Sequence, residues 1–180
     1  MKEAFPEGVQ VGFKRYRNLK ETLCRARLYD IIDRPIRETT LGWKKCTKCG
    51  TCQRSENRHQ FRCSATGEVF QIEVRITCKD LNVIYIIECQ RCAHKPQYAG
   101  KTKGCLMVRG GQHRRAVQDE SVEEKNKLYT HFSSGGHSVN DMLFYAIETV
   151  QGDDFTLQAR ERHWIDKLCT IPRGLNQNRT

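Results

Sequence analysis

Two tyrosines, an arginine and a histidine stand close together between residues 83 and 113 of this 180-residue chain. Tyr85 and Tyr98 each lie in or beside a short strand-like run, and Arg109 and His113 follow at four-residue spacing. Residues four apart occupy one face of a helix, so Arg109 and His113 should point toward the same region. A guanidinium binds phosphate oxygens through its forked N–H groups, and an imidazole exchanges protons near neutral pH. These four residues are therefore candidates for one functional site.

A carboxylate in the last predicted helix, at about 156–169, is a candidate for the same site. Glu161 falls on the apolar face of that helix, whose other members are Leu157, Trp164, Ile165 and Leu168. A carboxylate among core positions is costly unless it is paired or binds a metal ion. The alternative is a buried salt bridge to an arginine such as Arg109.

Cysteines at zinc-ligand spacing precede these residues. The segment K-K-C-T-K-C-G-T-C places Cys46, Cys49 and Cys52 two residues apart in a lysine-rich loop, which suits a tetrahedral thiolate site. The favoured fourth ligand is Cys78, with Cys63 as the alternative. The chain has 10 cysteines and its first residues lack an apolar signal core, so zinc is a better interpretation than disulfides.

A second zinc site is predicted from a cysteine pair and a histidine pair. Cys89 and Cys92 end an apolar run, and His131 and His137 flank two glycines in T-H-F-S-S-G-G-H. This spacing is typical of a Cys2His2 site. The alternative is that the two histidines are ordinary loop residues.

The net charge is +10, from 31 Lys and Arg against 21 Asp and Glu, which favours a polyanionic partner. The alternative is that the charge only improves solubility. The hydrophobic fraction is 38%, the mean hydropathy is -0.69, and no run approaches the roughly 20 apolar residues of a membrane span. We therefore expect a soluble, intracellular protein without a membrane partner.

The predicted elements form an α+β fold. Strands at 83–88, 97–100 and 143–150 should build the central sheet, and helices are expected at 103–118, 123–132 and 156–169. The strictly alternating run 70–78 predicts one strand, paired in a hairpin with 60–63 through the turn at 65–67. An amphipathic helix follows Asn18, and 33–42 reads as a linker. Gly110 and Gly111 are costly inside a helix, which indicates close approach of another backbone.

Five motifs in order resemble the GIY-YIG endonuclease domain over about residues 80–178: V-I-Y, Y-A-G, R-G-G-Q-H, E-R-H-W-I-D-K-L and G-L-N. Val83 replaces the first glycine of the family motif, and Ala99 the middle residue of its second part. The cysteine pair between the tyrosine motifs, the H-F-x-x-x-G-H segment, the upstream C-x-x-C and the N-L-K leader resemble the endonuclease part of Penelope-like retroelements.

The resemblance implies a small central three-stranded sheet flanked by helices, with an N-terminal helix and a zinc-knuckle and β-hairpin module. It divides the chain into a connector (1–42), a cysteine-rich zinc module (43–79) and the endonuclease domain with its inserted zinc site (80–180). It further implies that Glu161 holds one divalent ion, Mg²⁺ or Mn²⁺.

The residue roles follow from the same resemblance. Tyr85 is the candidate general base and Tyr98 orients water and phosphate, with help from Lys101 or His113 in removing a proton. Arg109 holds the scissile phosphate, and Asn176 anchors the site by hydrogen bonds. The DNA contacts are expected at Lys101, Lys103, Arg109, Arg114 and Arg115.

The predicted function is a metal-dependent DNA endonuclease that nicks target DNA to prime reverse transcription. Its expected partners are DNA, an upstream reverse transcriptase domain and the template RNA, and its expected location is the nucleus. The alternatives are a zinc-stabilised nucleic-acid-binding module without cleavage, and a repair-type nuclease acting on branched DNA.

Overall fold

The computed structural model describes residues 41–119 and 126–178, which belong to one compact unit. The predicted leader helix after Asn18, nearly all of the 33–42 linker and the first residues of the 123–132 helix lie outside the described residues. Within the described ranges, no helix combines the length and apolarity that crossing a bilayer requires.

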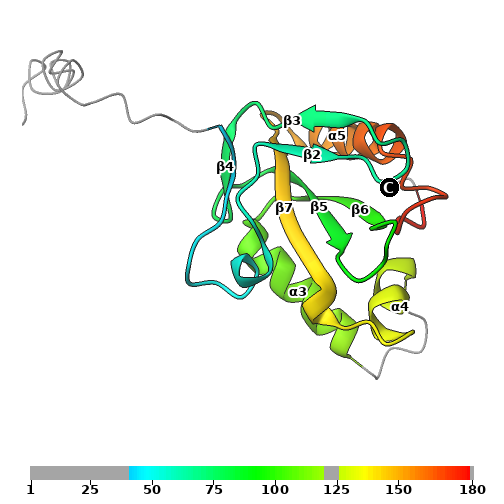
Figure 1. Ribbon diagram of the computed structural model, residues 1–180. Helices are drawn as coiled ribbons and strands as arrows, with labels where there is room; N and C mark the ends of the chain where they lie inside the picture. The colour runs from blue at the N-terminus through cyan, green and yellow to red at the C-terminus, as the bar shows by residue number, and fades with distance from the viewer. Residues whose placement is uncertain (1–40, 120–125, 179–180) are drawn as a thin grey trace, which may run out of the picture. The chain divides into compact units, whose positions relative to one another are not determined.

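Three strands form an antiparallel sheet in the order β6-β5-β7 (Figure 1). Their bounds are Val83–Cys89 for β5, Gln97–Thr102 for β6 and Met142–Thr149 for β7. Every residue of β5 is buried, as expected for a β-branched central strand. Tyr85 pairs with Gly100, and Ile87 pairs with Tyr98. Because residues two apart share a face, Tyr85 and Tyr98 lie on the same side of the sheet.

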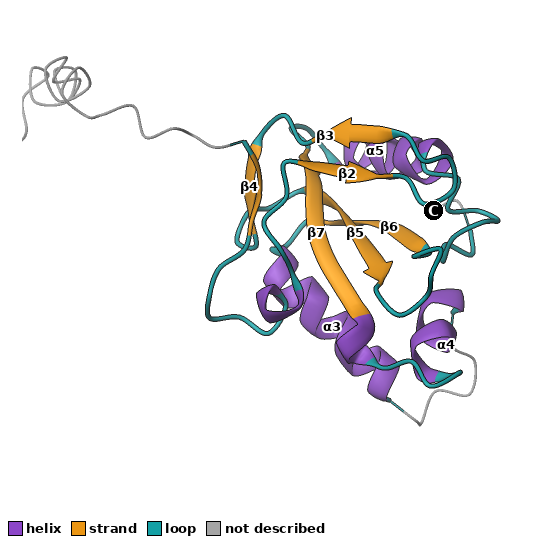
Figure 2. Ribbon diagram, in the orientation of Figure 1, coloured by secondary structure: helices purple, strands orange, loops and turns teal. Residues whose placement is uncertain are grey.

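The two faces of the sheet have different covers (Figure 2). Helices α3 (Leu106–Gln118) and α4 (Lys127–Ser133) pack on the tyrosine face, and the hairpin of β2 (Gln60–Arg62) and β3 (Val69–Gln71) and helix α5 (Asp154–Lys167) lie on the other. Phe144 and Tyr145, consecutive in β7, mark the two faces. The Phe144 ring lies 6.5 Å from His113 of α3, whereas the Tyr145 ring lies 5.9 Å from Phe61 of β2.

Polar side chains cap the N-termini of α4 and α5. Asn126 accepts a hydrogen bond from the Tyr129 amide at 3.0 Å, and Asp153 accepts one from the Thr156 amide at 2.9 Å. The remaining elements are short: β1 (Gly42–Lys44), the 3-10 turns η1 (Cys52–Arg54) and η2 (Val139–Asp141), and β4 (Arg75–Thr77). The predicted α+β class is confirmed, with three α-helices and a three-stranded antiparallel sheet in the described part.

The alternating run 70–78 is two strands, so the prediction of one continuous strand was wrong. Its first half, β3, pairs with β2 as predicted, but β4 pairs in parallel with β1 at the end of the predicted linker. Phe70, Ile72 and Ile76 are buried, whereas Val74 is 41% exposed. The chain bends at 73–74, where the Val74 carbonyl accepts a hydrogen bond from the Gly42 amide. Alternation shows which side chains are apolar, but not that both halves have the same partner.

Candidate active site and metal centres

The tyrosine, histidine and arginine predicted to act together do meet. The Tyr85 hydroxyl lies 2.7 Å from His113 Nε2, and Arg109 Nε donates to the same hydroxyl at 3.2 Å. The Tyr98 ring lies 6.4 Å from the Tyr85 ring and 5.8 Å from the His113 ring. Strands β5 and β6 supply the tyrosines, and one turn of α3 supplies the other two side chains. Tyr85 and His113 are buried, and Arg109 is partly exposed.

One residue of this cluster was missed by the sequence analysis. The Tyr129 hydroxyl of α4 lies 3.2 Å from His113 Nδ1, so His113 bridges two phenols. The consistent assignment has His113 Nδ1–H donating to Tyr129, which leaves Nε2 as acceptor for the Tyr85 hydroxyl. Tyr129 lies two residues before His131 in a predicted helix, and nothing in its spacing distinguishes it from a packing residue.

Burial decides the protonation of the cluster. It raises the pKa of Tyr85 well above its ordinary value, and Tyr98 adds to this shift while Arg109 opposes it. Burial, with the charge of Glu161, raises the pKa of Tyr98 to about 12. Burial and then Arg109 lower the pKa of His113 to about 3. At neutral pH both tyrosines are therefore phenols and His113 is a neutral imidazole.

Gly100 allows the two tyrosines to approach each other. A Cβ at this position would lie 2.6 Å from a Tyr98 ring carbon and 2.7 Å from the Tyr85 hydroxyl oxygen. No real side chain tolerates such contacts without displacing the rings. The glycine that ends Y-A-G therefore provides the space in which both phenols converge.

Glu161 reaches the same strand from α5. It is 4% exposed, and its Oε1 accepts a hydrogen bond from the Lys101 amide at 3.0 Å. Its Oε2 lies 3.5 Å from Lys101 Nζ. The ion pair that the alternative reading assigned to an arginine is thus made by a lysine. Lys101, expected to assist a tyrosine, has its ammonium beside this carboxylate instead.

Asn176 fixes the outer edge of β6. Its Oδ1 accepts from the Ala99 amide at 2.9 Å, and its Nδ2 donates to the Ala99 carbonyl at 2.8 Å. The Leu175 amide donates to the Gln97 carbonyl at 2.8 Å. Asn176 therefore holds the backbone between Tyr98 and Gly100, rather than contacting a phenol.

The five residues expected to contact DNA have different surroundings. Arg115 is exposed, Lys103 pairs with Asp154 at the surface, and Lys101 pairs with Glu161. Arg109 donates to Tyr85 and also to Gln112 Oε1, at 3.0 Å. Arg114 instead donates to Thr51 Oγ1 at 2.9 Å, so this side chain is directed toward the cysteine-rich loop.

The favoured four-cysteine set comes together. The Sγ atoms of Cys46, Cys49, Cys52 and Cys78 all lie within 4.8 Å of one another. Thiolates around one zinc ion would be about 3.8 Å apart, given a Zn–S distance of about 2.3 Å. The Lys48 amide and further hydrogen bonds lower the pKa of Cys46 to about 6, which favours a thiolate. The described cysteines are free of disulfides. This cluster can hold a metal ion such as zinc.

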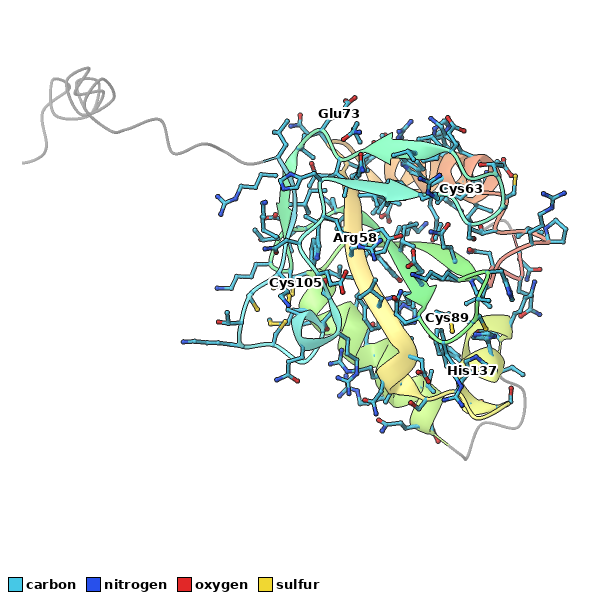
Figure 3. All side chains as sticks on the ribbon, in the orientation of Figure 1. Arg58, Cys63, Glu73, Cys89, Cys105 and His137 are labelled. Atoms are coloured by element: carbon cyan, nitrogen blue, oxygen red, sulfur yellow. The ribbon has the colours of Figure 1, made fainter. Side chains whose placement is uncertain are left out.

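The alternative ligand Cys63 is not part of this cluster. The β2–β3 hairpin was expected to bring it near the knuckle, but its buried Sγ contacts the Leu168 carbonyl at 3.4 Å, at the end of α5. In Figure 3 Cys63 lies beside the β2–β3 hairpin. The bend at 73–74 explains the error, because Cys78 follows β4 and not the hairpin strand.

The cysteine loop packs on helix α3, next to Arg109. Thr51 is fully buried, and its hydroxyl donates to the Met107 carbonyl at 3.0 Å. A Cβ on Gly110 would lie 2.5 Å from Thr51 Oγ1. The Met107 amide donates to the carbonyl of Cys78 at 3.0 Å. The close approach predicted at Gly110 is thus present, but a side chain makes it and not a backbone.

The second predicted cluster also forms. The ligand atoms of Cys89, Cys92, His131 and His137 all lie within 4.8 Å of one another. Cys92 Sγ lies 3.2 Å from His137 Nε2 and 3.8 Å from His131 Nε2. His137 Nδ1 lies 3.2 Å from the Ser134 carbonyl, the kind of contact that orients a metal-binding imidazole. These donors fit a tetrahedral metal ion that ties α4 to the end of β5.

Comparisons with protein-family models, curated proteins and solved structures found no match for this chain.

Proposed function

We propose that this chain is a metal-dependent DNA endonuclease of the GIY-YIG kind. The proposal is carried by the convergence of residues from four elements. Tyr85 of β5 and Tyr98 of β6 meet at Gly100, the α3 pair contacts the Tyr85 hydroxyl or its neighbouring ring, and Glu161 of α5 accepts from the Lys101 amide, one residue after Gly100. A binding module that only stacks or neutralises nucleic acid has no use for a buried phenol–imidazole–phenol chain beside a buried carboxylate. The convergence therefore favours cleavage over binding alone.

The hydrogen bonds suggest how a proton leaves the attacking water. Tyr85 takes a proton from the water as its own hydroxyl proton passes to His113 Nε2, and Tyr129 holds Nδ1–H so that Nε2 faces Tyr85. His113 is a poor base while it is buried beside Arg109, because both factors lower its pKa. The monoanionic phosphodiester of a bound strand would offset the Arg109 charge and raise that pKa. The substrate would thus help to activate its own cleavage.

Arg109 and Glu161 supply the charges around the phosphate. Arg109 is placed to neutralise the developing negative charge, which its forked guanidinium does better than a lysine. Glu161 fits a divalent cation, since its buried carboxylate reaches from α5 to β6, the strand of Tyr98, where it accepts from the Lys101 amide and pairs with the Lys101 ammonium. Mg²⁺ or Mn²⁺ bound there would stabilise the leaving oxygen.

We further propose zinc as the metal of both cysteine clusters and retroelement integration as the biological setting. The Cys2His2 cluster, whose cysteines lie between Tyr85 and Tyr98, supports the resemblance to Penelope-like endonucleases. In that setting the protein nicks DNA in the nucleus to prime reverse transcription, alongside an upstream reverse transcriptase domain and its template RNA.

Cleavage of supercoiled plasmid tests the activity. With Mg²⁺ present, Glu161→Gln and Arg109→Ala should each lose about 100-fold or more in nicking rate. The matched controls Glu73→Gln and Arg75→Ala alter exposed residues of the same types and should nick like the parent protein. Circular dichroism confirms folding of each variant, and metal analysis should find two zinc ions per chain.

Nicking that persists in both site variants, or that needs no divalent cation, would refute the proposal. Two zinc ions and tight DNA binding without any nicking would instead assign the chain as a binding module.

A further inference from the structure

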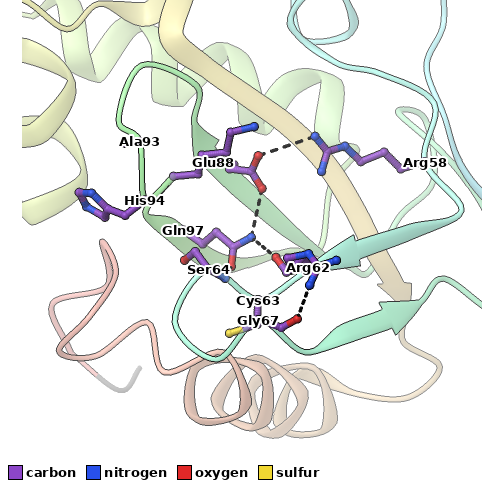
Figure 4. Close-up of a pocket in the computed structure, with 10 residues that line it drawn as sticks. Arg58, Arg62, Cys63, Ser64, Gly67, Glu88, Ala93, His94 and Gln97 are labelled. Atoms are coloured by element: carbon purple, nitrogen blue, oxygen red, sulfur yellow. Dashed lines mark hydrogen bonds and ion pairs between the residues drawn. The ribbon is translucent and has the colours of Figure 1, made fainter.

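A cavity on the sheet face opposite the tyrosines has a lining suited to an anion (Figure 4). Its volume is about 400 Å³, and its lining includes Arg58, Arg62, Ser64, Glu88, Lys95 and Gln97. Glu88 and Gln97 are cross-strand partners in β5 and β6, so their side chains share one face. Gln97 precedes Tyr98 in β6, and successive strand residues point to opposite faces. The cavity is therefore separate from the cleavage site.

The floor of the cavity is a buried polar network whose acceptors are already used. Glu88 is 5% exposed, and its Oε2 accepts from Gln97 Nε2 and from the Tyr145 hydroxyl, both at 3.1 Å. Its Oε1 accepts from Gln90 at 2.8 Å. Gln97 Oε1 accepts from the Ser64 amide at 3.1 Å. A ligand entering here meets few free acceptors.

The charged groups above this floor are mainly cations. Arg58, Arg62 and Lys95 against the single carboxylate of Glu88 give a net charge of three minus one, or +2, with histidine neutral. Arg58 lies 3.7 Å from Glu88, and Arg62 is steadied by donating to the Gly67 carbonyl at 2.8 Å. Arg58 is half-buried, whereas Arg62 and Lys95 are exposed, and cations at the rim of a cavity bind phosphate through charge-assisted hydrogen bonds. The volume is in the range of small-molecule pockets, which is more than a single inorganic ion needs.

Lys95 has a backbone conformation that a lysine does not favour. Its φ is 43°, in the left-handed region that glycine and asparagine adopt at lower cost. The turn itself is held by the Lys95 amide, which donates to the Cys92 carbonyl at 3.0 Å. Backbone geometry alone would select glycine here. Compared with glycine, Lys95 contributes an ammonium group to the lining of the cavity.

We propose that this cavity binds one nucleotide of a nucleic-acid strand through its phosphate, away from the bond that is cut. The inference rests on the proposed function only in taking nucleic acid as the source of the phosphate. Free mononucleotide and inorganic phosphate share that chemistry, so the experiment compares all three.

The test follows backbone amide signals of the metal-loaded full chain during titration with short oligothymidine, thymidine monophosphate and inorganic phosphate. Signals of Ser64 and Gly67 should shift with oligothymidine and with the mononucleotide, and far less with inorganic phosphate. Lys95→Gly should melt at the same or a higher temperature, because the strained residue is removed, while oligothymidine binding at these signals weakens about tenfold or more. Lys79→Gln removes one charge from an exposed lysine outside the cavity and should bind like the parent protein.

Unchanged binding by Lys95→Gly would overturn the proposal, as would equal affinity for inorganic phosphate and mononucleotide. Plasmid nicking by the parent protein without any shift at Ser64 and Gly67 would refute the cavity while leaving the endonuclease proposal intact. Shifts at these signals in a protein that does not nick plasmid would support the cavity and refute the endonuclease proposal.

Discussion

Replacing Gly110 by alanine should destabilise the protein, although alanine is the better helix former. The gain in helix propensity is about 1 kcal/mol. Against it, the new Cβ would lie 2.5 Å from Thr51 Oγ1 and 2.6 Å from Thr51 Cγ2, with Thr51 fully buried. Overpacking of this kind costs about 1–3 kcal/mol. Moving Thr51 also disturbs its bonds to Met107 and Arg114, at about 1 kcal/mol each. We expect a net loss of about 2–4 kcal/mol.

The neighbouring Gly111 provides the control. A Cβ there meets only Arg114 Nη2, at 3.7 Å, which is an ordinary contact. Gly111→Ala should therefore stabilise the protein by up to about 1 kcal/mol. Denaturant unfolding at fixed, saturating zinc measures both variants, and the two free-energy changes should have opposite signs.

A double-mutant cycle locates the cause. Thr51→Ala removes the atoms that Gly110→Ala would strike, so the double variant should lose less stability than the sum of the single variants. Because Thr51 lies between Cys49 and Cys52, Gly110→Ala should also weaken metal retention by the four-cysteine cluster in a chelator competition. Equal stabilisation by Gly110→Ala and Gly111→Ala would refute the close packing of Thr51 against Gly110.

Three further perturbations test the site. Gly100→Ala should reduce nicking about 100-fold, because its Cβ would lie 2.6 Å from the Tyr98 ring and displace the phenols; normal nicking by a folded variant would contradict this. The pKa of His113 is lowered to about 3 from 6.5, so the unfolded chain binds a proton that the folded chain does not. Stability from this group is complete above pH 6.5 and is lost as the pH falls, by up to about 1.4 kcal/mol per pH unit, and His113→Gln should flatten the slope in denaturant unfolding at several pH values. Cys46→Ser should lose one zinc ion per chain, whereas Cys63→Ser should keep its zinc; metal analysis after gel filtration decides between them.

Much of the sheet and both metal-ligand clusters can be predicted from patterns of residues that are close in sequence. The apolar run of β5, the restart at Gln97 and the C-x-x-C and H-x-x-x-x-x-H spacings each depend on residues close in sequence, and the structure has these elements and both clusters. Glu161 could also be identified from nearby residues, since the apolar residues one helical turn before and after it show that it lies on the apolar face of its helix.

The parts that could not be predicted depend on long-range pairing. Three such features are the split of 70–78 between two partner strands, the packing of Thr51 on Gly110 and the contact of Tyr129 with His113. In each, the sequence of one segment does not indicate which distant segment it will contact. Of these contacts, only the one at Gly110 could be anticipated, because glycine destabilises a helix and its presence there indicates a close approach by another group. That signal gave the position of a contact but not the identity of its partner.

The hydrogen bonds of Asn176 and Leu175 have a consequence beyond the cleavage site. Strand β6 is an outer strand of the sheet, and these two residues occupy the Gln97 carbonyl and both backbone groups of Ala99. Removing the chain from Leu175 onward would leave a row of unpaired amides and carbonyls open to another strand. A shortened protein would then be prone to pair edge to edge with its own copies, so the segment that aligns the tyrosines also keeps the molecules apart.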